Sequence, residues 1–155
     1  MNEKTSLPHA PSGLFAGALH LFPVRIYFED TDLSGVVYHA NYLRYMERAR
    51  SDMLRLAGID QRAANEAGEG AWAVTDLAIR YRAPARLDDE LLVESRMIAV
   101  RGASVQIGQT IKRGETVLTD ADVTAAFVSA TGRARRQPAG WADRFRAGVN
   151  DPTEQ

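Results

Sequence analysis

Residues that could do chemistry gather in one short segment, residues 29–41. Two carboxylates, Asp30 and Asp32, stand one residue apart and are followed by Gly35 and His39. A carboxylate that is ionised at neutral pH can attack a carbonyl carbon or take a proton from water. The same acidic turn could instead only cap a helix. The Asp-Thr-Asp pattern also suits a divalent cation, but no further cluster of carboxylates or histidines completes such a site, and we expect no metal.

A long helix is predicted directly after this segment, from about residue 39 to residue 56. Its apolar residues recur at helical spacing and form one stripe that should face the core. The members of this stripe are Tyr42, Tyr45, Met46, Ala49, Met53 and Leu56. The charged residues between them are spaced for ion pairs, Arg48 with Asp52 and Glu47 with Arg50. The acidic turn therefore leads to a helix N-terminus, where free backbone N–H groups and the positive end of the helix dipole lie.

Five strands are predicted from alternating apolar and polar residues, at 24–29, 71–82, 91–100, 105–112 and 117–127. In the first strand, Val24, Ile26 and Phe28 should share the buried face. Short turns should make the last four strands antiparallel neighbours. One long helix against one face of an antiparallel five-stranded sheet is an α+β two-layer domain. A single helix cannot cover so long a sheet, so we expect a partner subunit.

The chain is 155 residues long, 45% of them hydrophobic, which suits one domain. We predict a flexible tail over 1–20, a folded domain over 21–132 and a basic segment over 133–155. That last segment should hold a short helix around 141–146 and be disordered from residue 150. The apolar run at 14–19 is too short for a signal peptide or a membrane span.

Charge and cysteine content narrow the class of protein further. The net charge of -1 disfavours a nucleic-acid-binding protein, and the lack of cysteine fits a reducing compartment. We therefore expect a cytoplasmic protein with no membrane span. His9 and His20 are assigned no role.

Residues 27–42, with the sequence YFEDTDLSGVVYHANY, resemble the signature of the hydroxybenzoyl-CoA thioesterase family. Within that family the chain is most similar to the bacterial acyl-CoA thioesterases associated with the Tol–Pal envelope system. Further matches are YMERAR at 45–50, YRAPARLDD at 81–89 and RGAS at 101–104. The resemblance spans about residues 23–128. It implies a hotdog fold, in which the sheet wraps around one long central helix, and homodimers that join sheets edge to edge and often form homotetramers.

The resemblance assigns the catalytic carboxylate to Asp32 rather than Asp30, and the leading oxyanion donor to the backbone N–H of His39. A thioester carbonyl held at the helix N-terminus would have its developing negative charge stabilised there. Whether Asp32 acts as nucleophile or as general base stays open. The His39 side chain either polarises the carbonyl or positions water, or it is merely exposed.

Neighbouring residues receive roles with alternatives. Tyr38 and Asn41 flank the site, and Asn41 is expected to fix the loop or the helix start by side-chain hydrogen bonds. Tyr42 belongs to the core stripe. Glu47 either lines the pocket, as the family implies, or pairs with Arg50 on the surface.

For the nucleotide of coenzyme A, the resemblance points to Arg101 and Ser104, since an arginine fork suits phosphate. The basic run Arg133, Arg135 and Arg136 could add to this site or simply be solvated. No metal or redox cofactor is implied, and coenzyme A enters only as part of the substrate.

The favoured function is hydrolysis of a short- to medium-chain or aromatic acyl-CoA, with an acyl carrier protein adduct as a second kind of substrate. The alternative is a non-catalytic dimer that binds acyl-CoA or acyl carrier protein and serves the cell envelope. A hotdog dehydratase is disfavoured, because its acid and histidine are arranged differently. The sequence leaves open the acyl preference and the choice between dimer and tetramer.

Overall fold

The computed structural model describes residues 6–149. Its strands are β1 (Leu14–Ala16), β2 (Leu19–Arg25), β3 (Ala71–Tyr81), β4 (Glu90–Val100), β5 (Ser104–Arg113) and β6 (Thr116–Val128). Its helices are α1 (Asn41–Leu56), α2 (Gln61–Glu66) and α3 (Trp141–Val149), with a short 3-10 turn, η1 (Phe28–Asp30), before α1. The predicted long helix and the predicted C-terminal helix are both present, and a further short helix, α2, lies between α1 and β3. The part predicted to be disordered, from residue 150, lies outside the described residues.

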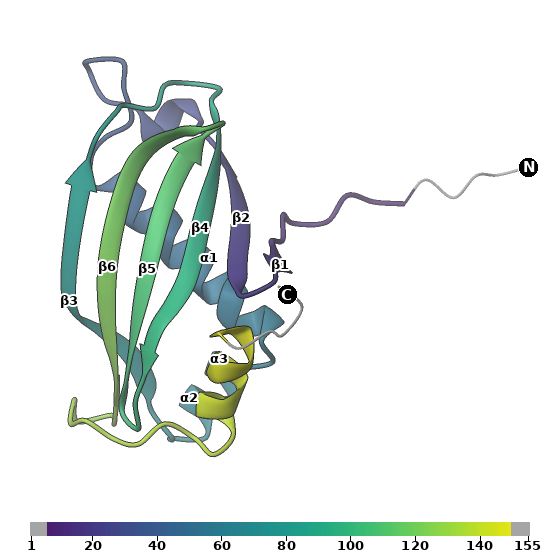
Figure 1. Cartoon of the computed structure of the whole chain (residues 1–155), viewed down its shortest axis with the longest axis vertical. Helices are drawn as coiled ribbons and strands as arrows, with labels where there is room; N and C mark the ends of the chain where they lie inside the picture. Colours follow the sequence, from purple (N-terminus) through teal and green to yellow (C-terminus); the bar gives the residue numbers. More distant parts are fainter. Residues whose placement is uncertain (1–5, 150–155) are drawn as a thin grey trace, which may run out of the picture.

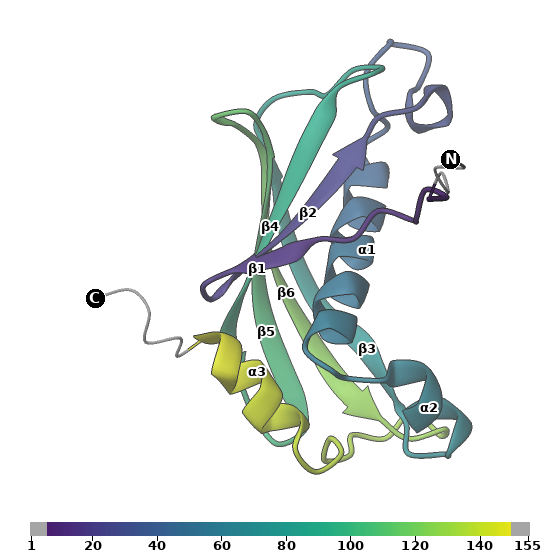
Figure 2. The same ribbon diagram turned by 90° about the vertical axis from the view of Figure 1, so that its right-hand side faces the viewer.

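The strands form one six-stranded antiparallel sheet in the order β1-β2-β4-β5-β6-β3, with α1 packed across one face (Figures 1 and 2). The predicted α+β class is confirmed. The predicted number of five strands is wrong. The sixth strand, β1, forms a hairpin with β2 around Gly17, whose φ of 61° suits a tight turn. The segment 1–20, predicted to be a flexible tail, thus contains β1 and the start of β2.

The predicted order of neighbours is also wrong for one strand. β3 does not pair with β4, because residues 82–89 carry the chain across the sheet instead of turning it back. β2 takes the place beside β4, and β3 pairs with β6 at the far edge, with Trp72 opposite Phe127. This leaves β3 as an edge strand of the sheet among the described residues.

The first predicted strand ends earlier than its alternation indicates. Val24 and Ile26 are buried as expected, but Phe28 lies in η1 with 81% of its surface exposed. The backbone turns here because the Asp30 N–H donates to the Tyr27 carbonyl. The turn redirects the chain toward α1.

Helix α1 forms from residues of high helix propensity, with no glycine, proline or β-branched residue between Asn41 and Leu56. Five of the six predicted stripe residues are buried, but Leu56 is 41% exposed and Leu54 is buried in its place. Gly58 follows the helix with a φ of 78°, as expected of a C′ residue. Each large side chain buried on this face contributes about 1.5–3 kcal/mol.

A layer of polar side chains divides the core beneath α1 into two apolar clusters. On β5, Gln109 lies between Ile111 of one cluster and Ile107 of the other, and Ser95 pairs with Gln109 across β4 and β5. The Gln109 amide donates to Ser95 Oγ (2.9 Å) and to the Met46 carbonyl of α1 (3.0 Å). These bonds fix where the helix lies on the sheet.

His20 extends this layer to β2 and binds Asp52 of α1, with 2.7 Å between Nε2 and Oδ2. Asp52 also accepts hydrogen bonds from the Gly13 N–H (3.0 Å) and Arg55 (2.7 Å), so its predicted pairing with Arg48 is wrong. Burial alone would raise the pKa of Asp52, but these donors outweigh it and hold the pKa below its ordinary value. His20, assigned no role from the sequence, is the fully buried partner of this carboxylate.

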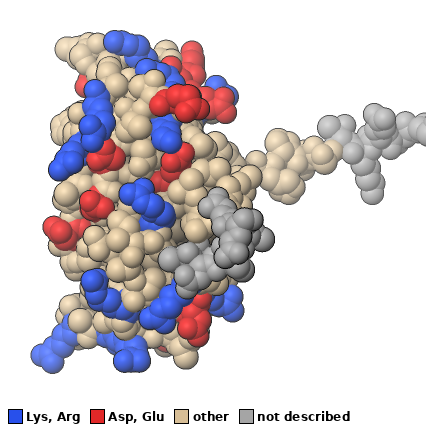
Figure 3. Space-filling view, in the orientation of Figure 1, with Lys and Arg blue, Asp and Glu red and all other residues tan. Residues whose placement is uncertain are grey.

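The opposite face of the sheet carries charged side chains of both signs, scattered among uncharged ones (Figure 3). An ion pair between Lys112 and Glu94 links β5 to β4, and Arg82, directly after β3, pairs with Asp120 of β6. Interspersed cross-strand charges are typical of a sheet face in contact with water.

Replacing Asp52 by alanine should destabilise the fold by about 3 kcal/mol, since buried donors on β2 and before β1 lose their acceptor. Chemical denaturation with urea measures this as a lower midpoint. Asp143→Ala is the matched control, because Asp143 is an exposed carboxylate of α3 and its loss should change stability by no more than about 0.5 kcal/mol. Equal stability of the two variants would contradict the importance of the Asp52 contacts.

Candidate active site

The loop between β2 and α1 is organised by the buried carboxylate of Asp30. Its Oδ2 accepts a hydrogen bond from the Tyr27 N–H (2.8 Å) and its Oδ1 one from the Asn41 side chain (3.0 Å). The carbonyl of Asp30 accepts from the Tyr38 N–H (2.9 Å). Asp30 thus joins both ends of the loop to the first residue of α1. Asn41 makes the loop-fixing side-chain hydrogen bond expected of it.

Asp32 lies two residues further on and is exposed. Its Oδ1 accepts hydrogen bonds from the backbone N–H (2.8 Å) and the hydroxyl of Ser34. None of the hydrogen bonds within residues 6–149 that meet ordinary geometry reaches Oδ2. The Ser34 hydroxyl, followed by the Ser34 N–H, lowers the pKa of Asp32 below its ordinary value. The Val36 N–H lies near enough to the carboxylate to lower its pKa further, and the nearby His39 adds a small effect in the same direction. The carboxylate is therefore ionised at neutral pH, with one oxygen free.

The N-terminus of α1 presents a free backbone donor beside this carboxylate. The Tyr38 carbonyl accepts a hydrogen bond from the Asn41 N–H (2.9 Å) and so points toward the helix. The His39 N–H belongs to the same peptide group and points in the opposite direction, away from the helix. No acceptor within residues 6–149 receives it. The capping residue, Ala40, has no side-chain oxygen to occupy the helix end. Such an N–H can donate to an anionic oxygen of a ligand.

Two aromatic side chains hold His39. The Tyr81 hydroxyl, at the end of β3, donates to the His39 carbonyl (2.9 Å). The Tyr38 ring lies against the imidazole, with centroids 4.6 Å apart, and both rings are exposed. Tyr42 is buried, as predicted, and its hydroxyl accepts from the Ala85 N–H (3.0 Å). His39, Tyr42 and Tyr81 line a pocket of about 300 Å³ at this end of the molecule.

Glu47 and Arg50 lie further along α1, at a second pocket between the helix and the sheet. The predicted ion pair between them is not among the salt bridges of the described residues. Arg50 instead donates to the Gln109 side chain (2.8 Å) and so belongs to the polar layer of the core. Glu47 is exposed beside it.

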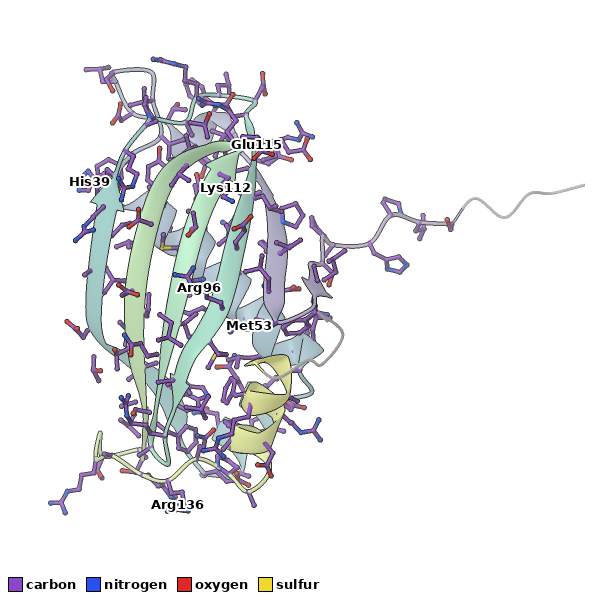
Figure 4. All side chains as sticks on the ribbon, viewed as in Figure 1. His39, Met53, Arg96, Lys112, Glu115 and Arg136 are labelled. Carbon is purple, nitrogen blue, oxygen red and sulfur yellow. The ribbon has the colours of Figure 1, made fainter. Side chains whose placement is uncertain are left out.

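Arg101 and Ser104 are not near Asp32 in the same chain. They flank the turn between β4 and β5, where the Arg101 N–H donates to the Ser104 carbonyl (2.8 Å). The loop of Asp32 lies at the other end of β4, whose 11 residues span about 36 Å. Figure 4 shows the two ends of the sheet, with His39 at one and Arg136, whose guanidinium lies beside Gly102 of the β4–β5 turn, at the other. The structure therefore brings Asp32, Tyr38, His39 and Asn41 together but places the predicted nucleotide site apart from them.

The sequence prediction missed two residues of this site. Ser34 could have been found, because an aspartate followed two residues later by serine is typical of a side-chain-bonded turn. Tyr81 could not, since its contact with His39 depends on how β3 is placed beside α1. In residues 6–149 we find no group of three or more side chains suited to a metal ion, and no helix long and apolar enough to cross a membrane.

Comparison with known sequences defines the class of this protein. The sequence profile of the Thioesterase superfamily matches residues 34–119. The acyl-CoA thioesterase YbgC of Haemophilus influenzae is 45% identical over 107 residues, which are 69% of this chain and 79% of that protein. The chain belongs to the thioesterase superfamily, so the family predicted from its motifs is confirmed.

Solved structures support the fold. A probable thioesterase from Bartonella henselae is 37% identical, with a TM-score of 0.74 over 77% of this chain and 99% of that one. A 4-hydroxybenzoyl-CoA thioesterase variant, complexed with 4-hydroxybenzoyl-CoA, has a TM-score of 0.73 at 22% identity over 83% of this chain and 99% of that chain. The second likeness concerns the fold alone. Both agree with the helix-on-sheet architecture described above.

Replacing Ser34 by alanine should raise the pKa of Asp32 toward the ordinary value of 3.8, because the hydroxyl that stabilises the ionised form is lost. The folded wild-type protein should keep Asp32 ionised to lower pH than the variant. NMR titration of the Asp32 carboxyl carbon measures both midpoints. Ser34→Thr keeps a hydroxyl and should titrate like the wild type. If all three proteins share one midpoint, the Ser34 hydroxyl does not control this carboxylate.

Proposed function

We propose that this protein is an acyl-CoA thioesterase that hydrolyses short- to medium-chain or aromatic acyl-CoA to the free acid and CoA. One observation carries the proposal: an exposed, ionised carboxylate with a free oxygen lies beside a helix N-terminus with a free N–H. That pair suits a thioester, whose carbonyl carbon needs a nucleophile while its oxygen needs a hydrogen-bond donor. Names of relatives such as YbgC support the same substrate class.

The lowered pKa of Asp32 favours the nucleophilic role. A general base works best when its pKa is near the operating pH, and hydrogen bonds from Ser34 move this carboxylate the other way. In the proposed route, Asp32 Oδ2 attacks the thioester carbon and the His39 N–H stabilises the resulting oxyanion. CoA leaves as the thiolate and takes a proton. Water then cleaves the mixed anhydride, which restores Asp32 and releases the acid. No cofactor takes part.

We further propose that the active form is a homodimer, alone or within a tetramer, joined along β3. β3 is an edge strand of 11 residues, and Val74 and Tyr81 on it are 49% and 47% exposed. An unpaired edge of this length readily adds another strand. Antiparallel pairing of two β3 strands would bring the Arg101 end of one subunit to the Asp32 end of the other. The nucleotide of CoA would then bind Arg101 and Ser104 of the partner subunit.

The remaining expectations follow from the resemblance and stay proposals. They are a cytoplasmic location, action on acyl carrier protein adducts as well as acyl-CoA, and a link to the Tol–Pal system. The non-catalytic acyl-CoA-binding dimer is the competing function. A binding protein needs no free carboxylate beside the thioester. The activity and binding measurements on Asp32→Asn, described next, separate the two functions.

Asp32→Asn should lower kcat on a panel of acyl-CoAs by at least about a hundredfold, because the amide cannot attack the carbonyl or accept a proton. Thiol release is measured with a thiol reagent, and binding of free CoA by calorimetry should be unchanged. Asp88→Asn makes the same change on the neighbouring β3–β4 loop, at a φ of 69° that asparagine tolerates, and should keep full activity. A wild type that binds CoA and hydrolyses no thioester would instead support the binding dimer.

The composite site can be tested by mixing two defective variants. Asp32→Asn should lack the chemistry, and Arg101→Ala should bind CoA more weakly and show a raised KM. In a dimer that carries one copy of each variant, one site regains both residues. Re-association of an equal mixture should therefore restore about a quarter of the wild-type sites. No gain over the two variants measured separately would place Asp32 and Arg101 outside a shared site.

A further inference from the structure

A small pocket lies between the second half of α1 and the sheet, and it has a cavity volume of about 110 Å³. Its outer residues are polar or exposed and include Glu47, Ser51 and Val74. Its inner residues are buried and apolar: Leu54, Val105, Ile107, Ala125 and Phe145. A polar entrance above an apolar interior suits a ligand with an apolar end.

The inner end of this pocket is closed by α3. Phe145 packs edge-to-face on Trp72 with ring centroids 5.9 Å apart. Trp141, one turn earlier on α3, contacts Trp72 and Phe127 but does not line the pocket. The helix lies beside the lower part of β4, below the end of β2 (Figure 1), and Arg144 donates to the Ala57 carbonyl (3.3 Å). Phe145 is therefore held by its contact with Trp72 and by the hydrogen bond that ties α3 to the end of α1.

The proposed dimer places this pocket beside the reacting groups of the partner subunit. Within one chain, His39 is bonded to Tyr81 at one end of β3, whereas the pocket is lined by Trp72 and Val74 near the other end of that strand. When two β3 strands pair antiparallel, the Tyr81 end of one strand meets the Trp72 end of the other. The partner subunit's Tyr81 donates a hydrogen bond to the carbonyl of the partner's His39, so the partner's His39 lies at that end of its β3. The partner's oxyanion donor thus comes to the pocket entrance.

We propose that Phe145 sets the upper length of the acyl group by forming the floor of the acyl pocket. This inference rests on the proposed thioesterase function and adds its specificity-determining residue. The cavity, of about 110 Å³, is smaller than an apolar cavity of roughly 150 Å³ that binds one benzene ring. Short, straight acyl chains fit it, while octanoyl and benzoyl groups meet the Phe145 ring. This narrows the range of substrates proposed above to short-chain acyl-CoA and excludes the medium-chain and aromatic acyl groups.

The test is a chain-length profile of kcat/KM from acetyl- to dodecanoyl-CoA, with benzoyl-CoA added. Phe145→Leu replaces the ring by a smaller apolar side chain and so deepens the pocket. The kcat/KM for octanoyl-CoA should therefore rise about tenfold relative to that for butyryl-CoA. Ala125→Val fills the pocket from β6 and should move the optimum toward shorter chains. A loosening of α3 alone would not explain both shifts, because they have opposite directions and Ala125 lies on β6.

Trp141→Leu is the matched control, since it removes an aromatic ring from the same helix without touching the pocket. It should lose stability and keep the wild-type chain-length profile. The inference is overturned if Phe145→Leu and Trp141→Leu shift the profile equally, or if neither pocket variant shifts it. Those results would leave the thioesterase function standing, provided that Asp32→Asn still abolishes hydrolysis. A wild type that hydrolyses no member of the panel would overturn both proposals.

Discussion

The position of α1 on the sheet depends on hydrogen bonds made beneath it by buried polar side chains. Apolar contacts are non-directional and would let a helix slide or rotate on a sheet at modest cost. The bonds from His20 to Asp52 and from Gln109 to the Met46 carbonyl allow one position only. Since these donors lie on β2 and β5, they also fix the helix relative to both sides of the sheet. The N-terminus of α1, where His39 presents its N–H, is placed by contacts in the core below it.

Two carboxylates, Asp30 and Asp32, are separated by one residue and are suited to different roles because their surroundings differ. Asp30 is 6% exposed, and each of its oxygens receives a hydrogen bond that closes the loop. Asp32 is exposed, and only one of its oxygens is bonded. A carboxylate whose lone pairs hold a loop together cannot also attack a substrate without opening that loop. The proposed division between a structural and a reactive acid therefore follows from burial, since the buried carboxylate holds the loop and the exposed one is accessible to a substrate.

The sequence predicted best what depends on nearby residues. Helical spacing located α1 and its buried face to within two residues at the N-terminus and placed its end at the residue observed, Leu56. It failed where partners are far apart in the chain. Asp52 and Arg48 have ideal spacing for an ion pair, yet Asp52 bonds His20, because the fold brings β2 beneath the helix. The place of β3 at the far edge likewise depends on the crossover of residues 82–89, which no local pattern encodes. The motif that suggested the family lies in the loop and helix start, so it led to the proposal of Asp32 and could not show where Arg101 lies relative to it.

The proposed reactive groups and the proposed acyl pocket are built from different parts of the chain, and this separation constrains how specificity can change. Asp32 and the His39 N–H depend on a loop of local hydrogen bonds at one end of α1. The floor of the pocket depends on α3, more than a hundred residues later in the chain and at the other end of the sheet. A substitution in α3 can alter the space for an acyl group without moving any atom of the carboxylate. In the proposed dimer the two parts meet only across the β3 edge. In that dimer, pairing of β3 does more than cover an open edge. It brings Asp32 of one subunit close to the acyl pocket of the other, two parts that lie far apart within one chain.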